Sequence, residues 1–114
     1  MATVLVVEDE TLIREFVAEE LEEAGYTVVI ASNADQAIAI LEARQDIHLV
    51  FTDIDMPGSM NGIKLAHAVR NRWPPIRIIA TSGHFAVRAG DLPADVPFIS
   101  KPYSSRQVAD LFRS

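Results

Sequence analysis

Five polar side chains stand where short apolar runs of the sequence end, and the three carboxylates among them could bind a metal ion. They belong to Glu8, Asp9, Asp53, Ser82 and Lys101. If folding brings them together, the three carboxylates repel one another by roughly 4 kcal/mol per pair at an intermediate dielectric, and a divalent cation relieves this repulsion. An oxygen-only site that keeps some of its waters suits Mg²⁺ better than Zn²⁺. These residues therefore predict a magnesium site.

The lysine and the serine extend the prediction to phosphoryl transfer. A metal ion and the Lys101 ammonium would neutralise the oxygens of a phosphoryl group, and the Ser82 hydroxyl would donate a hydrogen bond to it. Asp53 would then be the nucleophile and would form an acyl phosphate. Taken singly, such residues are typical of solvated turns and helix caps, so the prediction depends on their joint placement.

A second hydroxyl, that of Thr81, directly precedes Ser82. Because successive side chains of a strand point to opposite faces, only one of these hydroxyls can face Asp53. Thr81 is therefore the alternative to Ser82 as the hydroxyl donor.

Short apolar runs, rich in β-branched residues and bounded by turn residues, predict five strands, of which the first and the third are expected to be buried. The predicted strands are 4–7, 27–31, the stretch from His48 to Asp53, 76–81 and 96–100. Asp53 thus lies at the carboxyl end of an interior strand, which is where open α/β sheets hold their ligands.

Helices are predicted between the strands. Apolar residues at helical spacing predict a helix over 11–24, which Gly25 ends, and another helix ends before the prolines 74–75. Segment 85–95 contains a glycine and a proline, so any helix in it is expected to be short or irregular. Two further helices begin at capping pairs, Asn33 with Gln36 and Ser104 with Gln107.

The helices carry apolar positions that recur at helical spacing, and in every helix after the first these positions are expected to form the inner face. These positions are Leu12, Ile13, Phe16, Val17 and Leu21, then Ala34, Ala37, Ile38 and Leu41, then Ile63, Ala66, Val69 and Trp73, and finally Val108, Leu111 and Phe112. Trp73 is expected to pack at a helix end, and Tyr103 to be a surface aromatic. The regular alternation implies an α/β fold with a parallel sheet, right-handed crossovers and helices on both faces.

The chemistry-bearing residues make the whole chain, residues 1–114, resemble a response-regulator receiver domain of bacterial two-component signalling. The resemblance rests on the acidic pair Glu8-Asp9, the Asp53-x-x-Met-Pro turn, the end of the 76–81 strand with Ser82-Gly83, and Lys101-Pro102. It implies a doubly wound, flavodoxin-like sheet with strand order 2-1-3-4-5. It also favours Ser82 over Thr81, because the family has many Ser-Gly variants at this place.

The resemblance implies a phosphoacceptor that is not itself an enzyme, and it assigns roles to the residues. Asp53 would take a phosphoryl group from the phosphohistidine of a histidine kinase or phosphotransfer protein. Mg²⁺ would be held by Glu8, Asp9, Asp53 and the backbone carbonyl of Asp55, and Lys101 would contact the phosphoryl group. The peptide between Lys101 and Pro102 would be cis. The turn from 53 to 62 is one residue longer than is usual in the family.

The resemblance also predicts a switch and its surroundings. Ser82 would move toward the phosphoryl group while the aromatic Phe98 turns inward. Asp55 and His84, each two positions beyond a site residue, would line the mouth of the site and tune hydrolysis of the acyl phosphate. Downstream protein partners would bind the face that includes segment 85–95, which we expect to change on phosphorylation.

Composition limits other functions. The formal net charge is −6 and no cluster of basic residues is present, which argues against direct binding to nucleic acid. The chain has no cysteine, no basic leader and no apolar run near 18 residues, so we expect a soluble cytoplasmic protein without a membrane segment.

One enzyme class is an alternative. The pair Asp53 and Asp55 is similar to the aspartates of haloacid-dehalogenase-like, Mg²⁺-dependent phosphatases, in which the second aspartate is an acid/base. In that family the motif normally ends the first strand of the core, whereas here it ends the third predicted strand. A flavodoxin-like cofactor binder would need a Ser/Thr-rich phosphate loop where this chain has residues 8–10, which are all acidic.

Overall fold

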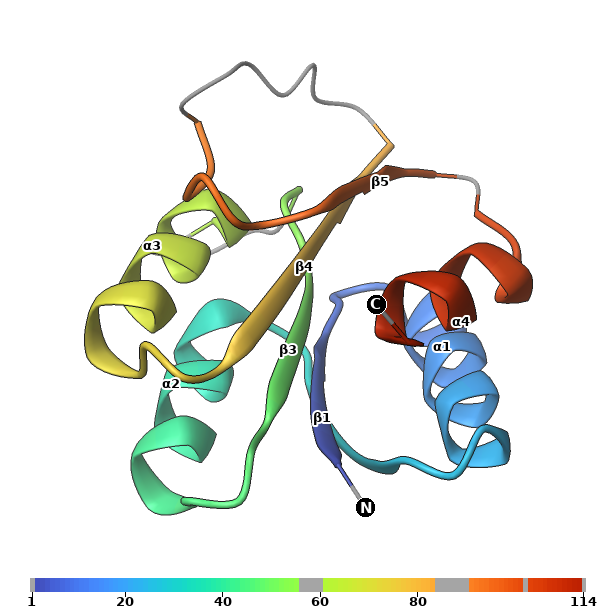
Figure 1. The fold of residues 1–114 in the computed structure, drawn as a ribbon, viewed down its shortest axis with the longest axis horizontal. Coiled ribbons are helices and arrows are strands. Elements are labelled where there is room, and N and C mark those ends of the chain that lie inside the picture. The colour runs from blue at the N-terminus through green and yellow to red at the C-terminus, as the bar shows by residue number, and fades with distance from the viewer. Residues whose placement is uncertain (1, 56–60, 84–90, 102, 114) are drawn as a thin grey trace.

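The fold was analysed in a computed structural model, which describes residues 2–55, 61–83, 91–101 and 103–113 (Figure 1). Five strands and four helices are present in these residues. In chain order they are β1 Thr3–Val7, α1 Thr11–Glu23, β2 Thr27–Ala31, α2 Ala34–Ala43, β3 Leu49–Asp53, α3 Gly62–Arg72, β4 Arg77–Ser82, β5 Phe98–Ser100 and α4 Ser105–Arg113. No helix in the described part of the chain is long and apolar enough to span a membrane.

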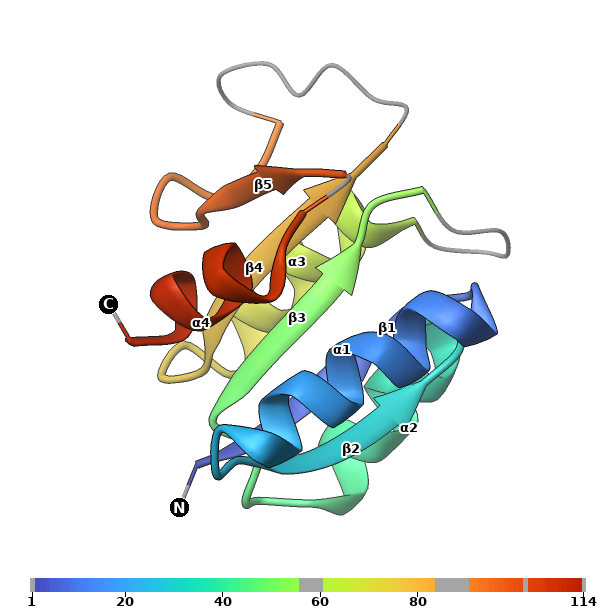
Figure 2. The same cartoon turned by 90° about the vertical axis from the view of Figure 1, so that its right-hand side faces the viewer.

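The five strands form one parallel sheet with the order β2-β1-β3-β4-β5, as the family resemblance implied. Helices α2 and α3 cover one face and α1 and α4 cover the other, so the sheet is doubly wound (Figures 1 and 2). The predicted fold class is therefore confirmed. Because β3 lies between β1 and β4, the carboxyl end of β3 is flanked by the ends of two other strands.

Alternation along each strand divides the core into two layers. On β3, Val50 faces the layer under α2 and α3, whereas Leu49 and Phe51 face the layer under α1 and α4. The strands β1 and β3 are buried along their whole length, which explains why they read as continuous apolar runs. The same alternation places Asp53 on the side of the sheet that α1 and α4 cover.

The predicted capping pairs are confirmed. Asn33 Oδ1 accepts a hydrogen bond from the Gln36 amide at 2.8 Å. Ser104 and Gln107 form a reciprocal capping box, in which each side chain accepts from the backbone amide of the other residue. Gly25 ends α1 with a φ of 100°, which is the left-handed conformation that favours glycine.

Only part of the apolar set of α1 packs on the sheet. Val17 and Leu21 are buried, but Leu12 is 81% exposed and Phe16 is 42% exposed. Leu12 precedes Val17 by five residues, which places the two about 140° apart around the helix. The helix can bury only one of these two directions against the sheet, so Leu12 and Phe16 are left at the surface.

The end of the sheet differs in detail from the predicted strands. The last strand begins at Phe98 instead of residue 96, because Pro97 has no backbone N–H for the sheet and Val96 closes a turn with Pro93. The predicted irregular segment 85–95 lies mostly outside the described residues, and its described part, 91–95, contains no helix. The side chain of Phe112 also lies outside them. The remaining predicted core positions of α2, α3 and α4 are buried or pack against the core, with Trp73 at the end of α3.

Gly62, the first residue of α3, lies directly against the main chain that leaves β3. A Cβ atom at this position would overlap the main-chain oxygen of Asp53 and lie 2.6 Å from the Ile54 Cα. We expect Gly62→Ala to lower the free energy of unfolding by about 1–3 kcal/mol, because neither backbone atom can move away without disturbing β3. Urea unfolding followed by circular dichroism measures this change.

Gly83→Ala is the matched control for that measurement. A Cβ atom at Gly83 would meet the Lys101 side chain at 3.5 Å and 3.6 Å, which is ordinary van der Waals contact. Its free energy of unfolding should change by no more than about 0.5 kcal/mol. Equal destabilisation by the two substitutions would show that the close approach at Gly62 is not the cause.

Candidate functional site

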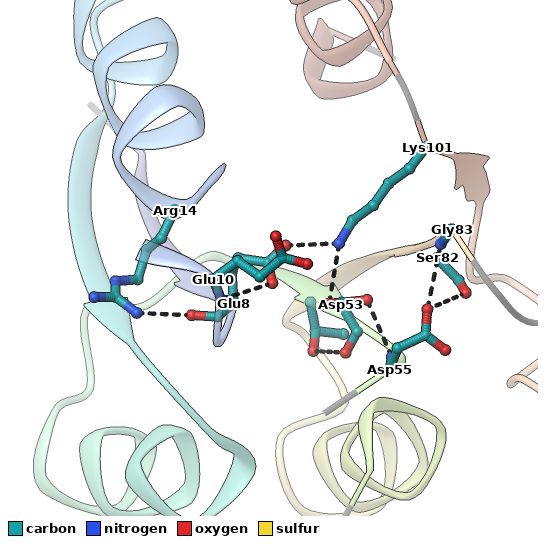
Figure 3. Close-up of polar contacts among 9 residues, drawn as sticks. Glu8, Glu10, Arg14, Asp53, Asp55, Ser82, Gly83 and Lys101 are labelled. Atoms are coloured by element: carbon teal, nitrogen blue, oxygen red, sulfur yellow. Dashed lines mark hydrogen bonds and ion pairs between the residues drawn. The ribbon is translucent and has the colours of Figure 1, made fainter. Parts of the chain in front are cut away.

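Two buried carboxylates and one ammonium group meet at the carboxyl edge of the sheet (Figure 3). Lys101 Nζ donates to Glu8 Oε1 at 2.9 Å and to Asp53 Oδ2 at 3.1 Å. Glu8 is 3% exposed and Asp53 is 2% exposed. Glu8 follows β1, Asp53 ends β3 and Lys101 follows β5, so the fold brings together residues that are up to 93 positions apart.

Backbone hydrogen bonds that continue the sheet fix these residues in place. The Glu8 amide donates to Ala31 O at 3.0 Å, and the Lys101 amide donates to Ser82 O at 2.9 Å. Beside Asp53, the amide of Ile54 donates to Thr81 O at 2.8 Å. Each site residue is therefore attached to a regular strand, which restricts its side chain to few directions.

Asp9 completes a group of oxygen ligands. One carboxylate oxygen from each of Glu8, Asp9 and Asp53 can be chosen such that all lie within 4.8 Å of one another. Three carboxylates and no nitrogen or sulfur ligand suit a hard divalent cation that keeps waters, which is the preference of Mg²⁺. The donor set thus fits the predicted magnesium ion.

Burial changes the protonation of the site. Burial, helped by the nearby Asp53 carboxylate and opposed by the hydrogen bond from Lys101, raises the pKa of Glu8 to about 8. Burial alone would lower the pKa of Lys101, but its hydrogen bonds to Glu8 and Asp53 outweigh that effect and hold it above its ordinary value. The lysine is therefore cationic at neutral pH, and without a metal ion Glu8 retains its proton.

Ser82 and Thr81, the two candidate hydroxyls, differ in their surroundings. Thr81 pairs with Asp53 in the β3–β4 register, so its side chain lies on the same side of the sheet as Asp53. Its hydroxyl is buried and has no hydrogen-bond partner among the described residues. The Ser82 hydroxyl donates to Asp55 Oδ2 at 2.6 Å, and the Gly83 amide donates to the same oxygen at 3.2 Å.

The site includes two side chains whose roles were not predicted. Arg14 Nη1 on α1 donates to the backbone oxygen of Glu8 at 2.9 Å and so holds the acidic turn from the helix side. Tyr103 is half-buried, and its ring centroid lies 5.8 Å from that of Phe51. The prediction that Tyr103 is a surface aromatic is therefore wrong. Burial, together with the charge of Glu8, raises the pKa of Tyr103 to about 12, so its hydroxyl is neutral.

Of the remaining predicted residues, Phe98 is half-buried on β5 and packs against the core layer under α2 and α3. The backbone amide of Asp55 donates to Asp53 Oδ1 at 3.0 Å, so Asp55 also adjoins Asp53. His84, the peptide between Lys101 and Pro102, and the longer turn through 56–60 lie outside the described residues.

The raised pKa of Glu8 predicts how the stability of the metal-free protein depends on pH. Between about pH 4.5 and 8, folded Glu8 keeps a proton that unfolded Glu8 has lost. The unfolded state therefore binds fewer protons, and the free energy of unfolding falls as the pH rises through this window. Glu8→Gln should remove this fall, so the difference between variant and unchanged protein should grow by more than about 1 kcal/mol from pH 5 to 8.

Urea unfolding at several pH values in the presence of a chelator makes this comparison. Glu10→Gln changes an exposed neighbour and is the control. Parallel pH profiles for Glu8→Gln and the unchanged protein would contradict a raised pKa for Glu8.

Comparisons with known proteins identify the family of the chain. Residues 4–113 match the family model of the response regulator receiver domain. The chain is similar to the response regulator receiver protein CpdR of Brucella abortus, with 34% identity over 96% of this chain and 92% of that protein. It is also 38% identical, over 95% of its length, to a part of the sensor kinase CckA of the same organism.

Two solved structures show the same fold. One is a response regulator receiver protein from Sinorhizobium medicae, with a TM-score of 0.89 and 29% identity, covering 95% of this chain and 88% of that one. The other is the response regulator TrrA of Thermotoga maritima in complex with Mg²⁺ and BeF, with a TM-score of 0.87 and 28% identity, covering 99% and 97%.

Several relatives are much longer than this chain, which spans 12% of CckA and 24% of the response regulator FleR of Pseudomonas aeruginosa. Within this chain, the range that matches the family model includes the acids after β1, the aspartate that ends β3 and the lysine after β5. The chain belongs to the response regulator receiver domain family of two-component systems.

Proposed function

We propose that this receiver domain is a phosphoacceptor switch in which Asp53 accepts a phosphoryl group from the phosphohistidine of a histidine kinase or phosphotransfer protein. The observation that carries the proposal is the pairing of Lys101 with both Glu8 and Asp53 in a buried cluster that Asp9 completes. A lone buried aspartate would avoid ionisation, whereas this one has a cation beside it and ligands for a second cation.

In the proposed transfer, a carboxylate oxygen of Asp53 attacks phosphorus. A P–O bond forms, the P–N bond to the donor imidazole breaks, and its electron pair returns to the imidazole nitrogen. Lys101 neutralises a phosphoryl oxygen as charge moves toward the aspartate. Glu8, Asp9, Asp53 and the backbone carbonyl of Asp55 would hold Mg²⁺, which supplies the remaining positive charge for the phosphoryl oxygens.

The switch would follow from new hydrogen bonds to the phosphoryl group. Ser82, the last residue of β4, is the proposed donor, and Thr81, whose side chain lies on the Asp53 side of the sheet, is the alternative. Phe98 would turn inward as Ser82 moves. It is half-buried on the short edge strand β5 and packs against the core layer under α2 and α3.

The proposed partners are proteins. The exposed side chains of Leu12 and Phe16 lie on the first two turns of α1, just after Glu8 and Asp9, so a phosphodonor that docks there would reach the site. Downstream partners would recognise the phosphorylated form on the face that includes β5 and α4. We place the protein in the cytoplasm, where such kinases act, and propose no direct role in binding nucleic acid.

The phosphatase alternative receives no support from the comparisons. The Asp53 strand is third in the chain and interior in the sheet, and the neighbouring Asp55 carboxylate accepts hydrogen bonds from Ser82 and Gly83. An acid/base residue would instead need to face a leaving group at the site. We therefore propose that the only chemistry of the chain is its own phosphorylation and dephosphorylation.

Incubation with acetyl phosphate and Mg²⁺ tests the proposed function. We expect intact-protein mass spectrometry to show at most one phosphoryl group per chain, and Asp53→Asn to abolish it because the amide is not a nucleophile. Asp35→Asn, which changes an exposed aspartate on α2, should be labelled normally.

The same assay separates the switch from the enzyme. Removal of magnesium with a chelator should prevent labelling of the unchanged protein. Labelling that persists in Asp53→Asn, or many turnovers on a phosphomonoester, would contradict the proposed function.

A further inference from the structure

The side chain of Asp55 takes part in a contact that the chemistry of the site does not require. Its Oδ2 atom accepts hydrogen bonds from the Ser82 hydroxyl at 2.6 Å and from the Gly83 amide at 3.2 Å (Figure 3). Among the described residues, the group able to hold a metal comprises Glu8, Asp9 and Asp53 and does not include this carboxylate. Asp55 therefore joins the end of β3 to the end of β4 without being a metal ligand through its side chain.

We infer that this pair of hydrogen bonds, which we call the Asp55 latch, holds Ser82 away from Asp53 until a phosphoryl group arrives. The inference rests on the proposed function, because the phosphoryl group is the competitor for the Ser82 hydroxyl. Asp55 is then a positioning residue, acting through Ser82 and not on the reacting atoms.

Ser82 can change partner without movement of its strand. Its backbone oxygen accepts from the Lys101 amide, and it pairs with Ser100 in the β4–β5 register. The hydroxyl is therefore carried by a fixed main chain, and rotation about one side-chain bond moves it between staggered positions. Because the hydroxyl has one proton to donate, a bond to Asp55 and a bond to a phosphoryl oxygen exclude each other.

Phosphorylation of Asp53 would favour opening of the Asp55 latch. The Asp55 amide contacts Asp53 Oδ1, so a phosphoryl group, which carries about −1.5 to −2 charges, would form next to Asp55. Repulsion between the two anions would then push the Asp55 carboxylate away from the site, while the phosphoryl oxygens offer the Ser82 hydroxyl an acceptor of higher charge. The other carboxylate oxygen, Oδ1, is buried and without a partner among the described residues, so the latched state leaves part of the carboxylate unsatisfied.

Opening would affect the main chain as well as the hydroxyl. Gly83 is held by Asp55 on one side, and on another it lies in contact with the stem of Lys101. Loss of the Asp55 bond would free the Gly83 amide while the lysine turns to the phosphoryl group. The latch would thus transmit phosphorylation of β3 to the chain that leaves β4.

Beryllofluoride with Mg²⁺, a mimic of the phosphoryl group, tests the latch. Asp55→Ala removes both the charge and the acceptor, whereas Asp55→Asn removes the charge and keeps an oxygen that can accept from Ser82. We expect Asp55→Ala to bind beryllofluoride at least about tenfold more tightly than the unchanged protein, because less of the protein is held in the latched state. Asp55→Asn should be intermediate.

A second set of variants lacks the Ser82 hydroxyl. In a Ser82→Ala background, Asp55→Ala and Asp55→Asn should have the same affinity, since there is no hydroxyl left to release. The amide proton of Gly83 gives a readout without any ligand: in Asp55→Ala its resonance should shift toward the position that beryllofluoride produces in the unchanged protein.

Equal affinities of Asp55→Ala and Asp55→Asn in the presence of Ser82 would overturn the latch and leave a simple effect of charge. A Gly83 resonance that does not move in Asp55→Ala would overturn it too. Failure of the unchanged protein to bind beryllofluoride would instead contradict the proposed function, and so the two failures can be told apart.

Discussion

The ion pairs of Lys101 with Glu8 and Asp53 are the interaction on which the site depends. Both carboxylates are almost fully buried, and an unpaired buried charge costs several kcal/mol. The lysine reaches them from β5, across the end of β4, because β4 lies between β3 and β5. Along this path the stem of Lys101 lies beside Gly83, the residue that follows β4.

Lys101 alone does not neutralise the carboxylates of this cluster. One ammonium group faces the carboxylates of Glu8, Asp9 and Asp53, which leaves an excess of negative charge at neutral pH. The metal-free protein reduces the excess by keeping a proton on Glu8, as the raised pKa of this residue indicates. Binding of a divalent cation is the other way to reduce the excess of negative charge. If Asp53 accepts a dianionic phosphoryl group as proposed, the same excess of negative charge would require a metal ion beside it.

The site residues that directly follow buried strands could be predicted from the sequence. Buried parallel strands are continuous apolar runs, so the residues that follow them, such as Glu8, Asp53 and Lys101, stand out and must meet at one edge of the sheet. The capping pairs were equally clear, since their bonds are local. What could not be predicted depends on how elements are rotated against one another.

The missed features are of that kind. Exposure of Leu12 and Phe16 follows from which direction of α1 meets the sheet, and the packing of Tyr103 on Phe51 follows from the path of the chain after β5. The bond between Asp55 and Ser82 joins residues 27 positions apart through side-chain torsions that no periodicity encodes. The hydrogen bond from Arg14 to the backbone oxygen of Glu8 could not be predicted either, because every residue type has a backbone oxygen.

The claim that Lys101 and a divalent cation balance the same carboxylates is tested most directly by thermal unfolding with and without Mg²⁺. The protein has two lysines, and Lys64 on α3 is exposed, so Lys64→Met is the control for Lys101→Met. Mg²⁺ should raise the Tm of Lys101→Met by more than it raises that of the control or the unchanged protein, because the ion then neutralises carboxylates that have lost their only ammonium partner among the described residues. An equal rise in all three proteins would contradict the account.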